Sequence, residues 1–141
     1  LSVLCSGMPL IYNGQEAGYD HRLAFFEKDP IAWREHPNGD LYRQLFALKH
    51  SNSALWNATW GAPMVRVTND QSSHVLSFVR ETEQNKVFAV FNFSGEHRDI
   101  QLLDGPYAGD YTDFFTGEAV RLDMPGAVVS LSPWDCAVFV R

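Results

Sequence analysis

Hydrophobic and polar positions follow different patterns before and after about residue 58. Apolar and polar side chains alternate over residues 75–81 (VLSFVRE) and 99–103 (DIQLL), whereas residues 86–93 (KVFAVFNF) are apolar at nearly every position. Alternation is typical of a half-buried strand, and a fully apolar run indicates a central strand covered on both faces. Turn sequences recur every ~8–12 residues, which indicates an antiparallel sandwich or barrel, and the fully apolar strand favours two packed sheets.

The mainly β region therefore predicts an antiparallel Greek-key β-sandwich of about eight strands. We expect the following residues to be largely buried: Phe78, Val87, Phe88, Ala89, Val90, Phe91, Val138 and Val140.

The pattern of residues 1–58 predicts one β/α unit, unlike the strands predicted after it. The run Pro9–Tyr12 before Asn13-Gly14 is typical of a buried parallel strand, which needs neighbouring strands on both edges. Residues 1–6 (LSVLCS) are interpreted as the tail of a helix that Gly7 ends, and residues 15–37 as a long surface loop. A helix is predicted over 40–50, with Asp40 as N-cap and an apolar stripe of Leu41, Leu45 and Leu48.

Composition narrows the function classes. The chain of 141 residues has 45% hydrophobic residues and a net charge of -6, with 11 basic against 17 acidic residues. An acidic chain without a basic cluster argues against nucleic-acid binding and against anionic membranes. The scattered histidines give no zinc spacing, and we expect no metal and no cofactor. Cys5 and Cys136 lie in apolar contexts and are interpreted as buried free thiols. Because the chain begins with Leu1, we expect it to be a piece of a longer polypeptide.

Several segments, in order, resemble the C-terminal part of the α-amylase family of glycoside hydrolases. GMPLIYNGQE (7–16) is similar to the family's last barrel strand, with Asn13 where a second Tyr is usual, and LYRQLFALKHSNSAL (41–55) to its last barrel helix. VLSFVRE, FAVFNFSGE, GDYTDFFTGE and LSPWDCAVFVR are similar to strands of its C-terminal sandwich. The resemblance implies a remnant of the catalytic (β/α)₈ barrel at 1–58 and the C-terminal sandwich at 59–141.

The resemblance also implies an activity for the parent enzyme. The implied parent enzyme is a retaining hydrolase or transglycosidase that acts on α-glucan or maltooligosaccharide. Such an enzyme needs two carboxyl groups ~5–5.5 Å apart. The family's catalytic carboxylates lie on barrel segments before the last strand, so none of the residues here takes a catalytic role. We expect this chain to be non-catalytic, with the missing catalytic barrel as its partner and the sandwich stabilising that barrel.

Glu16 and Tyr19 are the candidate substrate-binding residues. Glu16 follows the carboxyl end of the predicted barrel strand, the face where such barrels bind ligands. Its alternative role is a structural carboxylate bonded to loop amides or an arginine. Tyr19, Phe25 and Phe26 either contact glucan or anchor the loop. The tryptophans are expected in a core or an interface, with a sugar-binding surface as the alternative: Trp33, Trp56, Trp60 and Trp134. Tyr107 and Tyr111 are open to both interpretations.

Two functions and one assembly remain as expectations. The alternative to a stabilising domain is an autonomous carbohydrate-binding module, but such a module has no use for an apolar β/α unit. A polypeptide without barrel strands must cover the apolar surface of residues 1–58. We expect the helix to dock on the sandwich, and the segment Met8–Asn13 to lose its strand geometry or to find a partner strand from a second copy. Pairing into a homo-oligomer through residues 1–58 is one expected outcome.

Overall fold

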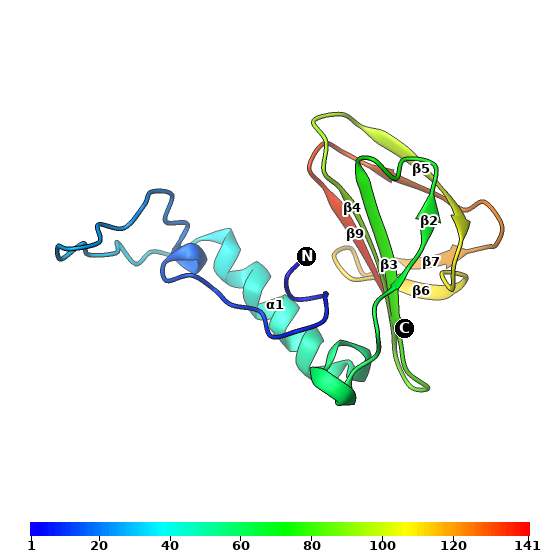
Figure 1. Ribbon diagram of the computed structural model, residues 1–141, viewed down its shortest axis with the longest axis horizontal. Coiled ribbons are helices and arrows are strands. Elements are labelled where there is room, and N and C mark those ends of the chain that lie inside the picture. Colours follow the sequence, from blue (N-terminus) through cyan, green and yellow to red (C-terminus); the bar gives the residue numbers. More distant parts are fainter.

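The computed structural model describes all 141 residues as a β-sandwich with an irregular, partly helical N-terminal region on one side (Figure 1). The helical elements, three of them 3₁₀ turns, are η1 (Gln15–Ala17), α1 (Pro37–Ser51), η2 (Ser53–Leu55) and η3 (Ala58–Trp60). The strands are β1 (Val65–Arg66), β2 (Thr68–Asn69), β3 (Val75–Glu81), β4 (Lys86–Asn92), β5 (Arg98–Asp104), β6 (Gly109–Asp113), β7 (Ala119–Leu122), β8 (Val128–Leu131) and β9 (Cys136–Val140). The predicted mainly antiparallel sandwich is confirmed, with nine strands where about eight were expected.

The strands form two antiparallel sheets. One sheet has six strands in the order β1-β3-β4-β9-β6-β7, and the other has three in the order β2-β5-β8. Strand β4 lies inside the larger sheet, with Phe88 opposite Val79 of β3 and Phe139 of β9. Every one of its residues is buried, with apolar clusters on both faces of the sheet.

The inner core fills the space between the two sheets. Fourteen buried residues form it, including Val79 and Phe88 from the larger sheet and Ile100 and Leu102 from the smaller. Tyr107 and Tyr111 belong to this core, so the sequence alternatives for these two residues resolve in favour of packing. The predicted burial is confirmed for every listed position except Val140, which is half-buried.

A second cluster covers the outer face of the larger sheet. Phe78, Phe91 and Val138 project from that face and pack with Leu4 and Leu55 from the N-terminal region. Leu48, near the end of α1, also packs against this cluster. The sandwich thus has a third layer, built from short segments of residues 1–60.

Arg80 joins the third layer to the sheet. Its side chain is 2% exposed and projects from β3 on the outer face. The guanidinium donates hydrogen bonds of 2.9–3.4 Å to the backbone carbonyls of Leu4, Cys5, Leu55, Trp56 and Ala62. None of these partners is a carboxylate. Burial lowers the pKa of Arg80 from its usual range, and it lowers the pKa of nearby Lys49, whose Nζ donates to the Leu55 carbonyl at 2.5 Å.

The strand predicted at Pro9–Tyr12 is wrong. This segment is irregular, and Met8, Leu10 and Tyr12 are 84%, 85% and 59% exposed. No other strand of this chain lies beside it, and a parallel strand cannot form without backbone partners. The turn that follows is instead local, with the Gln15 side chain accepting from the amide of Tyr12 at 2.8 Å. Of the two outcomes expected for Met8–Asn13, this chain shows the loss of strand geometry, and pairing with a second copy stays a prediction.

The N-terminal helices also differ from the prediction. Residues 1–5 form a single turn in which the amides of Leu4 and Cys5 donate to the Leu1 carbonyl, and Gly7 follows with φ 113°. Helix α1 begins at Pro37, three residues before the predicted start, and its N-cap is His36 in place of Asp40. Proline at the first helical position supplies the required φ, and the His36 Nδ1 accepts from the Asn38 amide at 3.2 Å.

Docking of the predicted stripe on the sandwich occurs at one end of α1. Leu48 packs on the outer cluster, Leu45 is half-buried, and Leu41 remains 40% exposed. In Figure 1 the first turns of α1 lie away from the sheet, with the loop of residues 19–36 beyond them. The division into domains at residues 58 and 59 stays a prediction.

Candidate functional site

An open cleft lies at the start of α1, where η1 and the end of the long loop meet the helix. Its volume is about 570 Å³. Trp33 is the one hydrophobic residue in the lining, which otherwise comprises Glu16, Arg34, Glu35, His36, Gly39, Asp40 and Arg43. We call it the Glu16 cleft.

Hydrogen bonds hold η1 against the helix and so fix the backbone of Glu16. The Asn38 side chain donates to the Gln15 carbonyl at 3.1 Å, and Arg34 donates to the carbonyls of Ala17 and Gly18 at 3.0 Å. Gly18 has φ 68°, and a Cβ there would lie 2.4 Å from the His36 ring. Only glycine fits beneath that ring without displacing it.

Glu16 lines the cleft, but one of its carboxylate oxygens is enclosed by the protein. Its Oε2 atom is buried and has no hydrogen-bond partner. A structural brace would place a loop amide or an arginine on this oxygen, and Oε2 has neither. A buried carboxylate oxygen without a donor costs free energy.

Tyr19 does not line the cleft. Its hydroxyl hydrogen-bonds with His21 and donates to Asp29 Oδ1 at 3.3 Å. Burial, followed by the charge of Asp29, raises the pKa of Tyr19. Asp29 also accepts from the Ala24 amide at 2.8 Å, so Tyr19 and Asp29 organise the loop. The roles of Glu16 and Tyr19 in substrate binding stay predictions.

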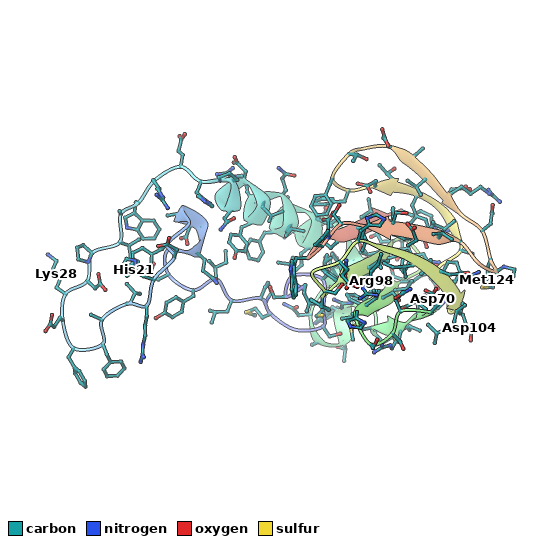
Figure 2. The ribbon with its side chains drawn as sticks, turned by 90° about the horizontal axis from the view of Figure 1, so that it is seen from above. His21, Lys28, Asp70, Arg98, Asp104 and Met124 are labelled. Atoms are coloured by element: carbon teal, nitrogen blue, oxygen red, sulfur yellow. The ribbon has the colours of Figure 1, made fainter.

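The loop of residues 19–36 extends away from the sandwich. Figure 2 shows His21 and Lys28 on this loop, at the opposite end of the molecule from Asp70, Arg98, Asp104 and Met124. Phe25 and Phe26 are 84% and 92% exposed and pack edge to face on each other, with ring centroids 4.7 Å apart. Side chains as exposed as these do not anchor the loop, which argues against that alternative.

All four tryptophans are outside the two cores. Trp33, Trp56, Trp60 and Trp134 are 61%, 44%, 77% and 72% exposed. The core interpretation is therefore wrong for each of them, because strand and helix positions elsewhere already fill both clusters. Their place in an interface with another domain stays a prediction.

Sequence reasoning did not identify Trp33, Arg34, His36 and Arg43 as neighbours of Glu16. Their distance along the chain, 17 to 27 residues, gave no periodic signal. Pro37 after His36 is the one local signal. Proline marks the first turn of a helix, so the residues before it lie at the N-terminal end of that helix.

Three further observations limit the chemistry. Nowhere in the chain do three His, Cys, Asp or Glu side chains gather so that they could hold a metal ion. No helix has the length and apolar character needed to cross a membrane. Cys5 and Cys136 are free and half-buried, and burial raises the pKa of the Cys136 thiol.

Comparison with known proteins identifies the sandwich. Residues 66–135 match the family model described as the α-amylase C-terminal all-β domain. The chain carries the C-terminal domain of an α-amylase-family enzyme. The chain is 26% identical over 125 residues to α-amylase 2 of Dictyoglomus thermophilum, covering 79% of this chain and 20% of that protein.

Another relative extends the family likeness, and a solved structure shows the same fold. Neopullulanase 2 of Thermoactinomyces vulgaris is 28% identical over 137 residues, covering 91% of this chain and 22% of that protein. The crystal structure of a noncanonic maltogenic α-amylase from Thermotoga neapolitana superposes with a TM-score of 0.81 and 20% identity, covering 99% of this chain and 34% of that one. The chain spans about a fifth of the length of the curated relatives that it matches.

Proposed function

We propose that this chain serves as the non-catalytic C-terminal region of an α-glucan-active glycoside hydrolase or transglycosidase, with residues 1–58 contacting the catalytic barrel. The sandwich stabilises that barrel by fixing the β/α unit in place. Amylase and neopullulanase are the activities in the names of the relatives, and these names support α-glucan as the substrate class.

The observation that carries the proposal is the two-sided character of residues 1–58. One side is fixed to the sandwich through Leu4, Leu55 and the carbonyls that Arg80 binds. Elsewhere in this region Met8, Leu10 and the Phe25–Phe26 pair are exposed to solvent. Large apolar side chains left exposed favour a protein contact.

The contact surface can be tested by replacing Phe25 and Phe26 together with serine. We expect the wild-type chain to bind an apolar dye such as ANS and to associate as concentration rises, since a second copy covers the surface when no barrel is present. The double variant should lose most of both signals and keep its free energy of unfolding within about 0.5 kcal/mol.

Control and contradiction come from the same measurements. Replacing exposed Leu103 of β5 with serine removes a smaller exposed apolar area, on the sandwich, and should leave association intact. A wild-type chain that binds no dye and sediments as a monomer at every concentration would reject the contact surface. Hydrolysis of starch, maltose or nitrophenyl glucosides by the pure chain would reject the non-catalytic role.

An autonomous carbohydrate-binding module is the second candidate, and Trp134 is the observation that favours it. Its indole is 72% exposed, and its backbone has φ 59°, a conformation that L-residues rarely adopt. The Trp134 amide donates to the Ser94 carbonyl at 3.0 Å, which holds the turn. Loss of maltoheptaose binding in Trp134→Ala would favour this module.

A further inference from the structure

The side chain that caps α1 is one that cannot accept a hydrogen bond once it is protonated. His36 is the N-cap residue, and its Nδ1 atom accepts from the Asn38 amide at 3.2 Å. The usual N-cap residues, Ser, Thr, Asp and Asn, accept this bond with an oxygen atom, which continues to accept in mild acid. An imidazole nitrogen accepts only while it carries no proton, and histidines gain their second ring proton between about pH 5 and 8. Mild acid can therefore remove the cap of α1.

His36 also joins η1 to the start of the helix. Its ring lies against Gly18, the residue that ends η1, and a Cβ on Gly18 would lie 2.4–2.7 Å from ring atoms. The Asn38 side chain donates to the carbonyl of Gln15, the first residue of η1, at 3.1 Å. The ring therefore packs on one end of η1, and the residue that it caps holds the other end. A change in the ring position is transmitted to both.

The charged groups that face His36 come from three segments packed around it. They are Glu16 of η1, Arg34 and Glu35 of the loop, and Asp40 and Arg43 of α1. The turn after β6 adds only the uncharged Phe115 beside the ring.

These charges oppose one another. Asp40 and Arg43 form an ion pair. Arg34 donates to the Gly18 carbonyl at 3.0 Å, so its guanidinium lies near the ring and disfavours a second positive charge, as does the N-terminal end of the helix dipole. The carboxylates of Glu16 and Glu35 favour that charge. The surroundings therefore exclude neither form of the ring.

We propose that His36 is a pH-sensitive cap: protonation of its ring releases the Asn38 amide and loosens η1 and the adjoining loop from the start of α1. In the capping form Nδ1 carries no proton, and Nε2 carries the one ring N–H. In acid both ring nitrogens become donors, so Nδ1–H would point at the Asn38 N–H. The ring must then turn, and because it is packed against Gly18, η1 moves with it.

The loosened loop carries Phe25 and Phe26, the exposed pair assigned above to a contact with the barrel. Mild acid would therefore weaken that contact. This consequence rests on the proposed function, whereas the cap itself depends only on the contacts of His36.

The test is an NMR titration of the full chain from pH 8 to pH 5.5, following the His36 ring nitrogens and the amides of Asn38 and Gly18. At pH 8 we expect the Nδ1 shift of an unprotonated nitrogen. As the pH falls, both amides should shift with the same midpoint as the ring. Hydrogen-exchange protection of the Asn38 amide should fall about five-fold, the factor for the net loss of one hydrogen bond.

Two variants separate the cap from other titrating groups. His36→Asn supplies an oxygen cap that does not titrate, so its Asn38 and Gly18 amides should not shift over this range. His74→Gln removes an exposed imidazole in the turn before β3, whose partner is Ser73, and its Asn38 and Gly18 amides should respond as those of the wild type do. Equal far-UV circular dichroism and melting temperature at pH 8 show that both variants fold.

Each other outcome overturns the inference. A proton on Nδ1 at pH 8 would mean that the ring does not cap the helix. Amides that stay fixed while the ring titrates, or that shift equally in His36→Asn, would mean that the cap is not the switch. Loss of the response in His74→Gln would place the switch elsewhere. The wild-type titration alone can give the first two results, so the inference is tested even where a variant does not fold. Dye binding and association at pH 8 do not depend on this titration, so failure here leaves the proposed function standing.

Discussion

The inner and outer faces of the six-stranded sheet both carry buried apolar clusters, yet they are covered in different ways. The inner face packs on three strands of the same sandwich, through side chains that alternate along each strand. The outer face is covered by Leu4 from the N-terminal turn, Leu48 from the end of α1 and Leu55 from η2. A regular sheet covers one face, and two short turns and the end of a helix cover the other.

The difference lies in how each layer satisfies its backbone. Strands of the inner layer pair their amides and carbonyls in ladders. The outer segments are too short for that, and several of their carbonyls are left without helical partners. Arg80 donates hydrogen bonds to these carbonyls. One buried cation therefore satisfies backbone acceptors in the third layer, as strand pairing satisfies them in the sandwich.

Removing Arg80 should produce the largest effect. Arg80→Ala removes a donor from five carbonyls, of which only that of Leu55 keeps another donor, Lys49, and it opens space under the third layer. We therefore expect a loss of about 4–5 kcal/mol in the free energy of unfolding. Guanidinium chloride unfolding measures it. Arg80→Lys keeps the charge and loses the fork of donors, and its loss should be intermediate. Arg66→Ala, in exposed β1, is the control. Equal stability of Arg80→Ala and the control would contradict this account.

Truncating Phe91 tests the outer cluster without touching Arg80. Phe91 is 6% exposed and stacks with Phe78 at 6.1 Å between ring centroids. Phe91→Ala should cost about 3–4 kcal/mol, because the cavity lies between sheet and third layer. Limited proteolysis should then cut residues 1–60 faster than the sandwich. Uniform cleavage of both regions would show that the third layer is not separately weakened.

A substitution at Gly61 tests the close packing of the third layer, with a smaller expected loss of stability than the two changes above. A Cβ at this position would lie 1.9 Å from the Trp56 carbonyl oxygen and 2.9 Å from the Arg80 guanidinium. Gly61→Ala must shift backbone in the third layer, and we expect a loss of about 2 kcal/mol. Gly95→Ala is the matched control, since its Cβ would meet only the Trp134 indole at 3.8 Å. Thermal unfolding of both variants measures the difference, and identical melting temperatures would reject the close approach.

The smallest effect at neutral pH is expected in the inner core. Burial raises the pKa of Tyr111, whose hydroxyl donates to the Tyr107 carbonyl at 2.7 Å. A tyrosine in the unfolded chain ionises near pH ~10, whereas the folded chain keeps this proton. Above that pH the folded state binds more protons, so stability falls as pH rises.

Tyr111→Phe should remove part of this loss. We expect it to cost about 1 kcal/mol near pH 7 through the lost hydrogen bond. Between pH 9 and 11 its melting temperature should fall less steeply than that of the wild type. Tyr12→Phe, at a ring that is 59% exposed, should leave the pH profile unchanged. Parallel profiles for wild type and Tyr111→Phe would contradict the prediction.

The contact and cleft residues show where prediction from sequence stopped. Glu16 was identified from its place after a strand-like motif, but the strand itself is absent because no neighbour pairs with Pro9–Tyr12. Its neighbours Trp33, Arg34 and Arg43 were not foreseen, because an irregular loop has no period from which to predict contacts. Their approach depends on His36 capping α1 and on Asn38 and Arg34 binding η1.

The sequence by itself determined the sandwich. Alternation along β3 and the apolar run of β4 indicate which faces are buried, and turn residues indicate where strands end. It also indicated the family, through motifs that keep their order. The apolar run of β4 and the stripe of the helix also predicted that the N-terminal region covers the sheet. Only the tertiary structure decided that Leu4 and Leu55 provide much of that cover and that Arg80 is the link. The physical reason is that strand periodicity is local, whereas a buried cation finds its carbonyls up to 76 residues away along the chain.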